Sequence, residues 1–435
     1  VTEMYSYVAF LNVIFTLGLE TGYFRFATKL GDEQRVYNQT LSILLAFSIF
    51  LSVFFLFFSS NIATSLGYEH HENYIQWLAL TIALDTVVAI PFAQLRLKNE
   101  AKKFATFKLV NIVINIAMNV YLLYFVSKSV QNVFLSNLVA SMVTLLLLHK
   151  SFTSFKISYD QPFIKELITY SFPIMLMGLA GMINEVIDRL MLKYWLPDTM
   201  SMEEKLTQLG IYGACYKLSI FMSIAIQSFK YGADAFFFTE SNSKDAPKTY
   251  ALVMHWFVVV CLVIMVGVSL NLDVLKFILR REQYHQGLMI VPILLLANLF
   301  LGIYYNLSVW FKMTDKTYWG AFMNLIGAVI TLILNIVFIP KYGYWASAWA
   351  TLICYFSMAA LSYYIGQGYF KVPYNVLKLM VYITISFIFT YVVNRLINGS
   401  FLVNFVLKNI FLLGFIFVLY KLELYKLKSL VKLKK

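Results

Sequence analysis

Seven long segments of this chain contain no Lys, Arg, Asp or Glu. The shortest has 19 residues, close to the ~20 residues that an α-helix needs to cross ~30 Å of hydrocarbon. The runs are continuous and lack the short alternating segments of a membrane β-barrel. Only 13% of residues are charged and 60% are apolar, so the chain cannot cover itself with a water-soluble surface. These features predict an all-α polytopic membrane protein.

Thirteen apolar stretches are long enough for one membrane-spanning helix each. We place these spans at 4–24, 39–59, 74–95, 105–126, 130–149, 166–195, 210–238, 250–270, 286–309, 318–339, 343–365, 374–394 and 401–420. Taken alternately, the intervening loops contain 21 Lys plus Arg on one side, including the tail from residue 421, and 7 on the other. Cytoplasmic loops are enriched in basic residues, so we expect the richer side and the C-terminus to be cytoplasmic. Topology then explains the net charge of +13, and no nucleic-acid partner is expected.

A weak internal repeat relates two parts of the chain at an offset of about 211 residues. Tyr5–Phe24 aligns with Tyr216–Ala235, and the spans at 39–59 and 250–270 coincide at the same offset. Six spans separate the copies, so both have the same orientation, as in transporters whose substrate path lies between two lobes. We therefore expect two pseudo-symmetric six-helix lobes followed by two additional helices. The predicted domains are an N-terminal lobe at 1–149, a cytoplasmic inter-lobe linker at 150–165, a C-terminal lobe at 166–365, and two additional helices with a basic cytoplasmic tail at 366–435. An odd number of spans and the missing initiator Met suggest that the first helix of a fourteen-helix parent is absent.

Three ordered motifs carry a resemblance to a known family. They are FTLGLETGYFRFATK (15–29), YSFPIMLMGLAGMINEVIDRLMLKYWL followed by LGIYGACYKLS (170–196 and 209–219), and LNIVFIPKYGYWASAWATLICY (334–355). The chain resembles, over nearly its whole length, the polysaccharide-transporter (O-antigen and capsule flippase) branch of the multidrug/oligosaccharidyl-lipid/polysaccharide flippase superfamily. Members of that branch are similar fourteen-helix proteins with two six-helix lobes and two C-terminal helices.

The resemblance implies a secondary transporter of the bacterial plasma (inner) membrane, not an enzyme. Its expected substrate is an isoprenoid-pyrophosphate-linked oligosaccharide, such as an O-antigen, capsule or exopolysaccharide repeat unit of lipopolysaccharide-type pathways, moved from the cytoplasmic to the outer leaflet by alternating access. The expected partners are this lipid-linked substrate, membrane lipids, and the glycan polymerase and glycosyltransferases of the same pathway. An ionised pyrophosphate cannot cross hydrocarbon unpaired, so the transporter needs a polar and partly cationic cavity.

Ionisable residues within spans are functional candidates by default, since each costs ~2.5–3.5 kcal/mol at a helix centre. The cavity candidates are Arg25, Lys217, Lys230, Glu20 and Asp234. Related flippases place basic side chains on the corresponding helices, so the resemblance implies that the three cations attract the pyrophosphate. The alternative is that Lys230 pairs with Asp234 at i, i+4 while the other cations extend to the membrane surface.

A second set of candidates could serve in cation coupling or gating. Asp85 stands mid-span without a charged neighbour within ten residues, and could be protonated, bonded to another helix, or a coupling site. Glu185, Asp188, Arg189 and Lys193 form a stripe near one end of the sixth span. In that stripe we expect a Glu185–Arg189 ion pair that locks the packing of the lobes or acts as a gate.

Two other function classes compete with a flippase. A cation-coupled multidrug exporter of the same superfamily should have a predominantly acidic cavity, whereas the candidates here are mixed. An integral membrane glycan polymerase or acyltransferase should have a large external loop, and the longest outer loop is about 15 residues. Adjacent Glu69, His70, His71 and Glu72 point apart in a short loop, so no metal is expected. No nucleotide or hydrolase motif is present, and no cofactor is expected.

Overall fold

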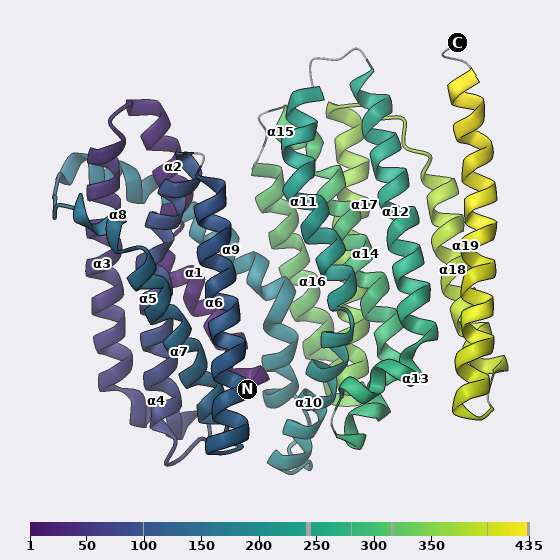
Figure 1. Cartoon of the computed structure of the whole chain (residues 1–435), viewed down its shortest axis with the longest axis horizontal. Coiled ribbons are helices and arrows are strands. Elements are labelled where there is room, and N and C mark those ends of the chain that lie inside the picture. Colours follow the sequence, from purple (N-terminus) through teal and green to yellow (C-terminus); the bar gives the residue numbers. More distant parts are fainter. Residues whose placement is uncertain are drawn as a thin grey trace. The chain divides into compact units, whose positions relative to one another are not determined.

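A computed structural model gives the fold of this chain (Figure 1). It describes all residues except 99, 241–244, 280, 315, 317, 398 and 433–435, and no side chains at 231–236, 238–240, 312 and 424–432. The described residues are helical or in loops, and they contain no β-strand. The prediction of an all-α protein is confirmed.

The chain divides into two compact units, Glu3–Met182 and Ile183–Lys435. The predicted division into lobes at 1–149 and 166–365 stays a prediction. The first unit consists of α1 (Thr2–Thr16), α2 (Leu19–Leu30), α3 (Glu33–Phe57), α4 (Ser59–Ser65), α5 (Glu72–Leu97), α6 (Ala101–Tyr121), the π-helix η1 (Leu122–Val126), α7 (Val130–Leu147), α8 (His149–Thr153) and the first part of α9 (Gln161–Tyr194).

The second unit begins within α9. It continues with α10 (Met202–Leu218), α11 (Ile220–Glu240), α12 (Ala246–Leu270), α13 (Leu272–Leu275), the 3₁₀ helices η2 (Lys276–Ile278) and η3 (Glu282–Ile290), α14 (Val291–Leu307), α15 (Val309–Met313), α16 (Tyr318–Tyr342), α17 (Tyr344–Tyr369), α18 (Val376–Leu396) and α19 (Phe401–Lys432).

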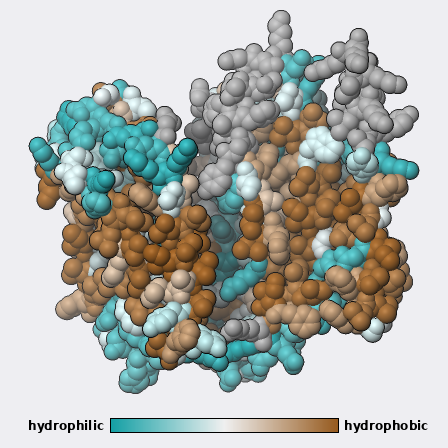
Figure 2. Space-filling model, viewed as in Figure 1, coloured by the Kyte–Doolittle hydropathy of each residue, from teal (hydrophilic) through white to brown (hydrophobic). Residues whose placement is uncertain are grey.

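Twelve helices among the described residues are long and apolar enough to cross a membrane, and a bent pair raises the number to 13. They correspond one to one with the predicted spans. Figure 2 shows that each unit has a belt of apolar residues with hydrophilic residues towards its ends. Many large apolar side chains are exposed, including Phe50, Ile116 and Ile333, because their solvent is hydrocarbon. The chain is a multi-pass membrane protein.

The bent pair is the seventh predicted span. α10 and α11 meet at Ser219 with a bend of 51°, so the span predicted at 210–238 is a bent pair of helices and not one straight helix. The first span is also broken, between α1 and α2, where Leu17 and Gly18 have φ values of 51° and 67°. A Cβ at Gly18 would lie 2.7 Å from the Ser171 carbonyl oxygen, so glycine permits both the left-handed backbone and the close approach to α9.

Three prolines lie in apolar spans, and their positions in the helices differ. Pro91 and Pro173 lie inside the continuous helices α5 and α9. Pro292 lies in the first turn of α14, where the missing N–H removes no helical hydrogen bond.

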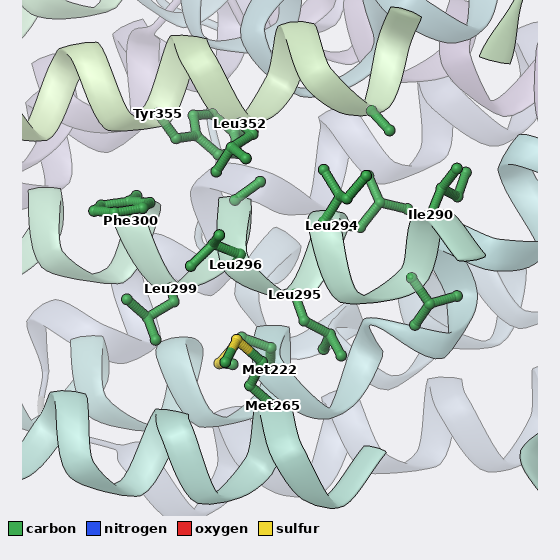
Figure 3. Packing of buried hydrophobic residues seen from close by; sticks show 14 of the residues in the cluster. Met222, Met265, Ile290, Leu294, Leu295, Leu296, Leu299, Phe300, Leu352 and Tyr355 are labelled. Carbon is green, nitrogen blue, oxygen red and sulfur yellow. The ribbon is translucent and has the colours of Figure 1, made fainter. Parts of the chain in front are cut away.

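The core of the second unit surrounds α14. Figure 3 shows Leu294, Leu295 and Phe300 of this helix between α17 on one side and Met222 and Met265 on the other. Residues 293–300 of α14 are all buried, so other helices enclose α14 on every side and it forms the centre of the core.

Candidate functional site

In the first unit, the predicted candidate Glu20 has a cationic partner. Glu20 lies in the first turn of α2 and forms an ion pair with Arg96 in the last turn of α5. The two side chains are 42% and 41% exposed, so the pair contributes at most about 1 kcal/mol to stability. Its effect on function is to neutralise Glu20.

Arg25 projects from the same helix and is exposed. Its guanidinium carbon lies 4.1 Å from the ring centroid of Tyr170 on α9, a cation–π contact. Among the described residues no carboxylate forms an ion pair with Arg25. Stacking uses the face of the guanidinium and leaves N–H groups at its edge for an anionic ligand.

Asp85 on α5 accepts a hydrogen bond of 2.7 Å from the Ser141 hydroxyl on α7. Of the three alternatives for this residue, bonding to another helix is therefore observed, and cation coupling stays a prediction. Asp85 is also exposed, so the bond to Ser141 leaves part of the carboxylate accessible.

A ladder of asparagines on α6, which bonds to the same helix α7, was not predicted. Asn111, Asn115 and Asn119 are spaced four residues apart on α6, and each occupies the same face of the helix. Asn111 donates to Thr144 on α7 at 2.8 Å, and Asn115 donates to Asn137 on that helix. The four-residue spacing of amides within an apolar segment was the available signal. Such side chains link helices where no water can serve as a partner.

In the second unit, Asp188 on α9 is enclosed by hydrogen-bond donors. It is 2% exposed, and the Arg189 backbone N–H donates to it at 2.8 Å. The Tyr212 hydroxyl on α10 donates to the same carboxylate, and the Thr351 hydroxyl on α17 lies 3.5 Å away. A buried carboxylate requires such partners, so this cluster ties α9, α10 and α17 together.

The rest of the predicted stripe on α9 does not form one ionic lock. Glu185 is exposed and makes no ion pair with Arg189 among the described residues. The Arg189 guanidinium lies instead 4.4 Å from the ring centroid of Tyr216. Lys193 is buried at 3% exposure. The predicted Glu185–Arg189 ion pair is thus absent, since the guanidinium packs against the Tyr216 ring of α10 instead. The role of the stripe as a lock or gate stays a prediction.

The predicted cations of the seventh span lie on two different helices. Lys217 is exposed in the last turn of α10, and no ion pair of Lys217 occurs in the described part of the chain. Lys230 is also exposed and lies on α11, with its ammonium 4.5 Å from the ring centroid of Tyr305 on α14. The side chain of Asp234 lies outside the described residues, so the Lys230–Asp234 pair stays a prediction.

A buried ionic cluster on three helices was not predicted from the sequence. The Glu423 carboxylate on α19 accepts hydrogen bonds from Lys378 at 2.5 Å and Tyr382 at 2.8 Å, both on α18. His255 on α12 lies 2.7 Å from the same carboxylate. Each of these residues is an ionisable or polar side chain in or beside an apolar span. That feature of the sequence could have identified them as candidates.

The family described as "Polysaccharide biosynthesis protein" matches residues 1–274. The chain belongs to this family. No curated protein sequence matches the chain.

Solved structures with a similar fold are membrane transporters. The lipid II flippase MurJ in an inward closed conformation is 15% identical with a TM-score of 0.72, covering 97% of this chain and 93% of that chain. An inward-facing multidrug resistance MATE family transporter of the MOP superfamily is 11% identical with a TM-score of 0.58, covering 87% and 88%. A MOP superfamily transporter from Pyrococcus furiosus is 11% identical with a TM-score of 0.61, covering 84% and 86%. This polysaccharide biosynthesis protein thus shares the fold of MOP-superfamily transporters, in agreement with the predicted branch.

Proposed function

We propose that this protein is a secondary transporter that flips an isoprenoid-pyrophosphate-linked oligosaccharide, such as an O-antigen or capsule repeat unit, from the cytoplasmic to the outer leaflet. The proposed site of action is the bacterial inner membrane, with the C-terminus in the cytoplasm and movement by alternating access. Membership of a polysaccharide biosynthesis family supports a glycan substrate. The fold shared with a lipid II flippase supports a lipid-linked one.

The single observation that carries this proposal is the difference in exposure and ion pairing between the basic and acidic candidate residues. Arg25 and Lys217 are exposed and have no ion-pair partner among the described residues. Glu20 is neutralised by Arg96, and Asp188 is enclosed by donors. The exposed cations Arg25, Lys217 and Lys230 outnumber the exposed candidate carboxylates Asp85 and Glu185. This excess of positive charge supports binding of an ionised pyrophosphate.

The excess of exposed cations over exposed carboxylates disfavours the alternative of a multidrug exporter for cationic compounds, in which accessible carboxylates should prevail. The study of the Pyrococcus furiosus transporter connects a reversed polarity of its binding pocket with a different function. We infer by the same chemistry that cations in this chain favour an anionic substrate.

Transport of such a substrate can proceed without nucleotide hydrolysis. A pyrophosphate diester carries roughly two negative charges, and a negative-inside potential drives each outward by ~2.3 kcal/mol per 100 mV. Asp85, whose accessible carboxylate accepts a hydrogen bond from Ser141, is the proposed site of any additional cation coupling. The Asp188 cluster is the proposed gating element, because it joins three helices that must move together.

The direct test is charge neutralisation. In cells that depend on the protein, Arg25→Gln, Lys217→Gln and Lys230→Gln should each reduce outer-leaflet glycan at matched protein levels. Loss of one charge-assisted hydrogen bond weakens capture by ~1.5–3 kcal/mol. Arg25→Lys and Lys217→Arg should retain most transport.

Lys103→Gln is the matched control, since Lys103 is 63% exposed and pairs with Glu100. Full transport by all three neutral variants would exclude capture of the pyrophosphate by these three cations. Loss of transport in the Lys103→Gln control would show that overall charge, and not these positions, is responsible.

A further inference from the structure

The second unit contains a cavity of about 440 Å³ at the end where α13 lies (Figure 1). Helices α13, α14, α17, α18 and α19 each contribute to its wall. Most of the wall is apolar, and its polar groups are Asp273, Asn394, Asn404 and Lys408 together with Thr390 and Tyr391. None of the candidate transport residues lines it.

One side of the cavity carries an ion pair. The ammonium of Lys408 on α19 lies 2.6 Å from a carboxylate oxygen of Asp273 on α13. The Lys408 side chain is 8% exposed, whereas that of Asp273 is 34% exposed. Next to this pair, Asn271 and Asn409 exchange two amide hydrogen bonds of 2.9 and 3.3 Å. These contacts fix both charges in place and leave the carboxylate open to a further donor.

Two asparagine side chains add one hydrogen-bond acceptor and one donor to the cavity. The Asn394 amide nitrogen donates to the Ser269 carbonyl at 3.1 Å, which leaves its carbonyl oxygen available. The Asn404 carbonyl oxygen accepts from the Gly399 N–H at 2.7 Å, which leaves its NH₂ group available. The cavity therefore offers acceptors on Asp273 and Asn394 and donors on Lys408 and Asn404.

The apolar wall is suited to hydrocarbon chains. Trp345 and Trp349 are one turn apart on α17 and line the cavity. The same two tryptophans line a second groove of about 430 Å³, whose other side is formed by apolar residues of α16 such as Phe338. The two grooves thus flank one ridge of indole rings, and tryptophan favours the interface between hydrocarbon and headgroups.

We propose that this cavity binds a diacyl phospholipid whose headgroup combines a phosphate with a primary ammonium, as in phosphatidylethanolamine. The ammonium donates to Asp273 and Asn394, the phosphate accepts from Lys408 and Asn404, and the acyl chains lie in the two grooves beside Trp345 and Trp349. A purely anionic headgroup leaves the Asp273 carboxylate facing like charge. A quaternary ammonium has no N–H for that carboxylate. Complementary placement of both charges distinguishes this cavity from an ordinary lipid-facing surface.

The test is native mass spectrometry of the full chain released from vesicles that contain equal amounts of phosphatidylethanolamine, phosphatidylglycerol and phosphatidylcholine. We expect the wild-type protein to retain phosphatidylethanolamine about tenfold over the other two, the scale of one charge-assisted hydrogen bond. Asp273→Asn should abolish this preference. Trp349→Ala should reduce retention of all three lipids.

Asp245→Asn is the matched control, since Asp245 is 70% exposed, pairs with Lys248 and lies outside the cavity. If Asp273→Asn does not fold, the double variant Asp273→Asn/Lys408→Gln removes both charges and should lose the preference in the same way. Equal retention of the three lipids by the wild-type protein would overturn the proposal. An unchanged preference in the folded Asp273 variants would overturn it as well.

Discussion

Removal of the Glu423 carboxylate should strongly destabilise the second unit. Glu423 is 4% exposed and accepts from Lys378 and Tyr382 while it also contacts His255. Glu423→Ala leaves the Lys378 ammonium, whose side chain is 17% exposed, without its partner. Breaking a buried pair from one side costs about 3–5 kcal/mol. At about 2–4 °C per kcal/mol for a domain of this size, the unfolding temperature should fall by about 6–20 °C.

Intrinsic tryptophan fluorescence during heating of the detergent-solubilised protein measures this change. The double variant Glu423→Leu/Lys378→Met should recover most of the loss, because it removes both charges and keeps the volume. Asp245→Ala breaks an exposed pair with Lys248 and should change the unfolding temperature little. The reasoning is refuted if Glu423→Ala behaves like Asp245→Ala, or if the double variant is no more stable than Glu423→Ala.

Three further changes test other parts of the structure. Gly18→Ala should destabilise the first unit by more than the ~1–2 kcal/mol of a left-handed residue, because its Cβ would lie 2.7 Å from the Ser171 carbonyl oxygen; an unchanged unfolding temperature would contradict the tight α2–α9 contact. Tyr212→Phe removes a donor to the buried Asp188 and should cost about 1–3 kcal/mol in the same assay, and a neutral effect would show that the cluster does not hold the helices. Asp85→Asn should keep its bond to Ser141 and normal stability while it lowers transport only when a cation gradient is imposed; equal transport with and without the gradient in both proteins would exclude Asp85 as the coupling site.

Hydropathy predicted the existence and order of the spans but not their ends. The span predicted at 39–59 is α3, which begins earlier, at Glu33. The Asp32 side chain accepts a hydrogen bond from the Arg35 N–H and thereby caps a polar first turn of the helix. The residue types around Ser219 did not predict the bend, because no Gly or Pro lies between residues 214 and 231. Helix ends and bends depend on hydrogen bonds and packing, which the mean hydropathy of a segment does not describe.

The candidate residues were found more readily than their partners. Ionisable residues such as Asp85 and Asp188 are conspicuous in apolar segments, and the structure gives both a hydrogen-bond donor on another helix. Those donors are Ser and Tyr residues that look ordinary in the sequence. His255 and Glu423 are separated by 168 positions, so only the packing of α12 against α19 brings them together.

The central claim is transport of a lipid-linked anionic glycan. The most direct measurement uses the purified chain in vesicles with a fluorescent isoprenoid-pyrophosphate oligosaccharide in the inner leaflet and a negative-inside potential. A membrane-impermeant quencher then reports how much substrate reaches the outer leaflet. We predict rapid, potential-dependent quenching that the triple variant Arg25→Gln/Lys217→Gln/Lys230→Gln loses. Quenching no faster than in protein-free vesicles, together with efflux of a cationic dye by the same preparation, would contradict the account and favour a multidrug exporter.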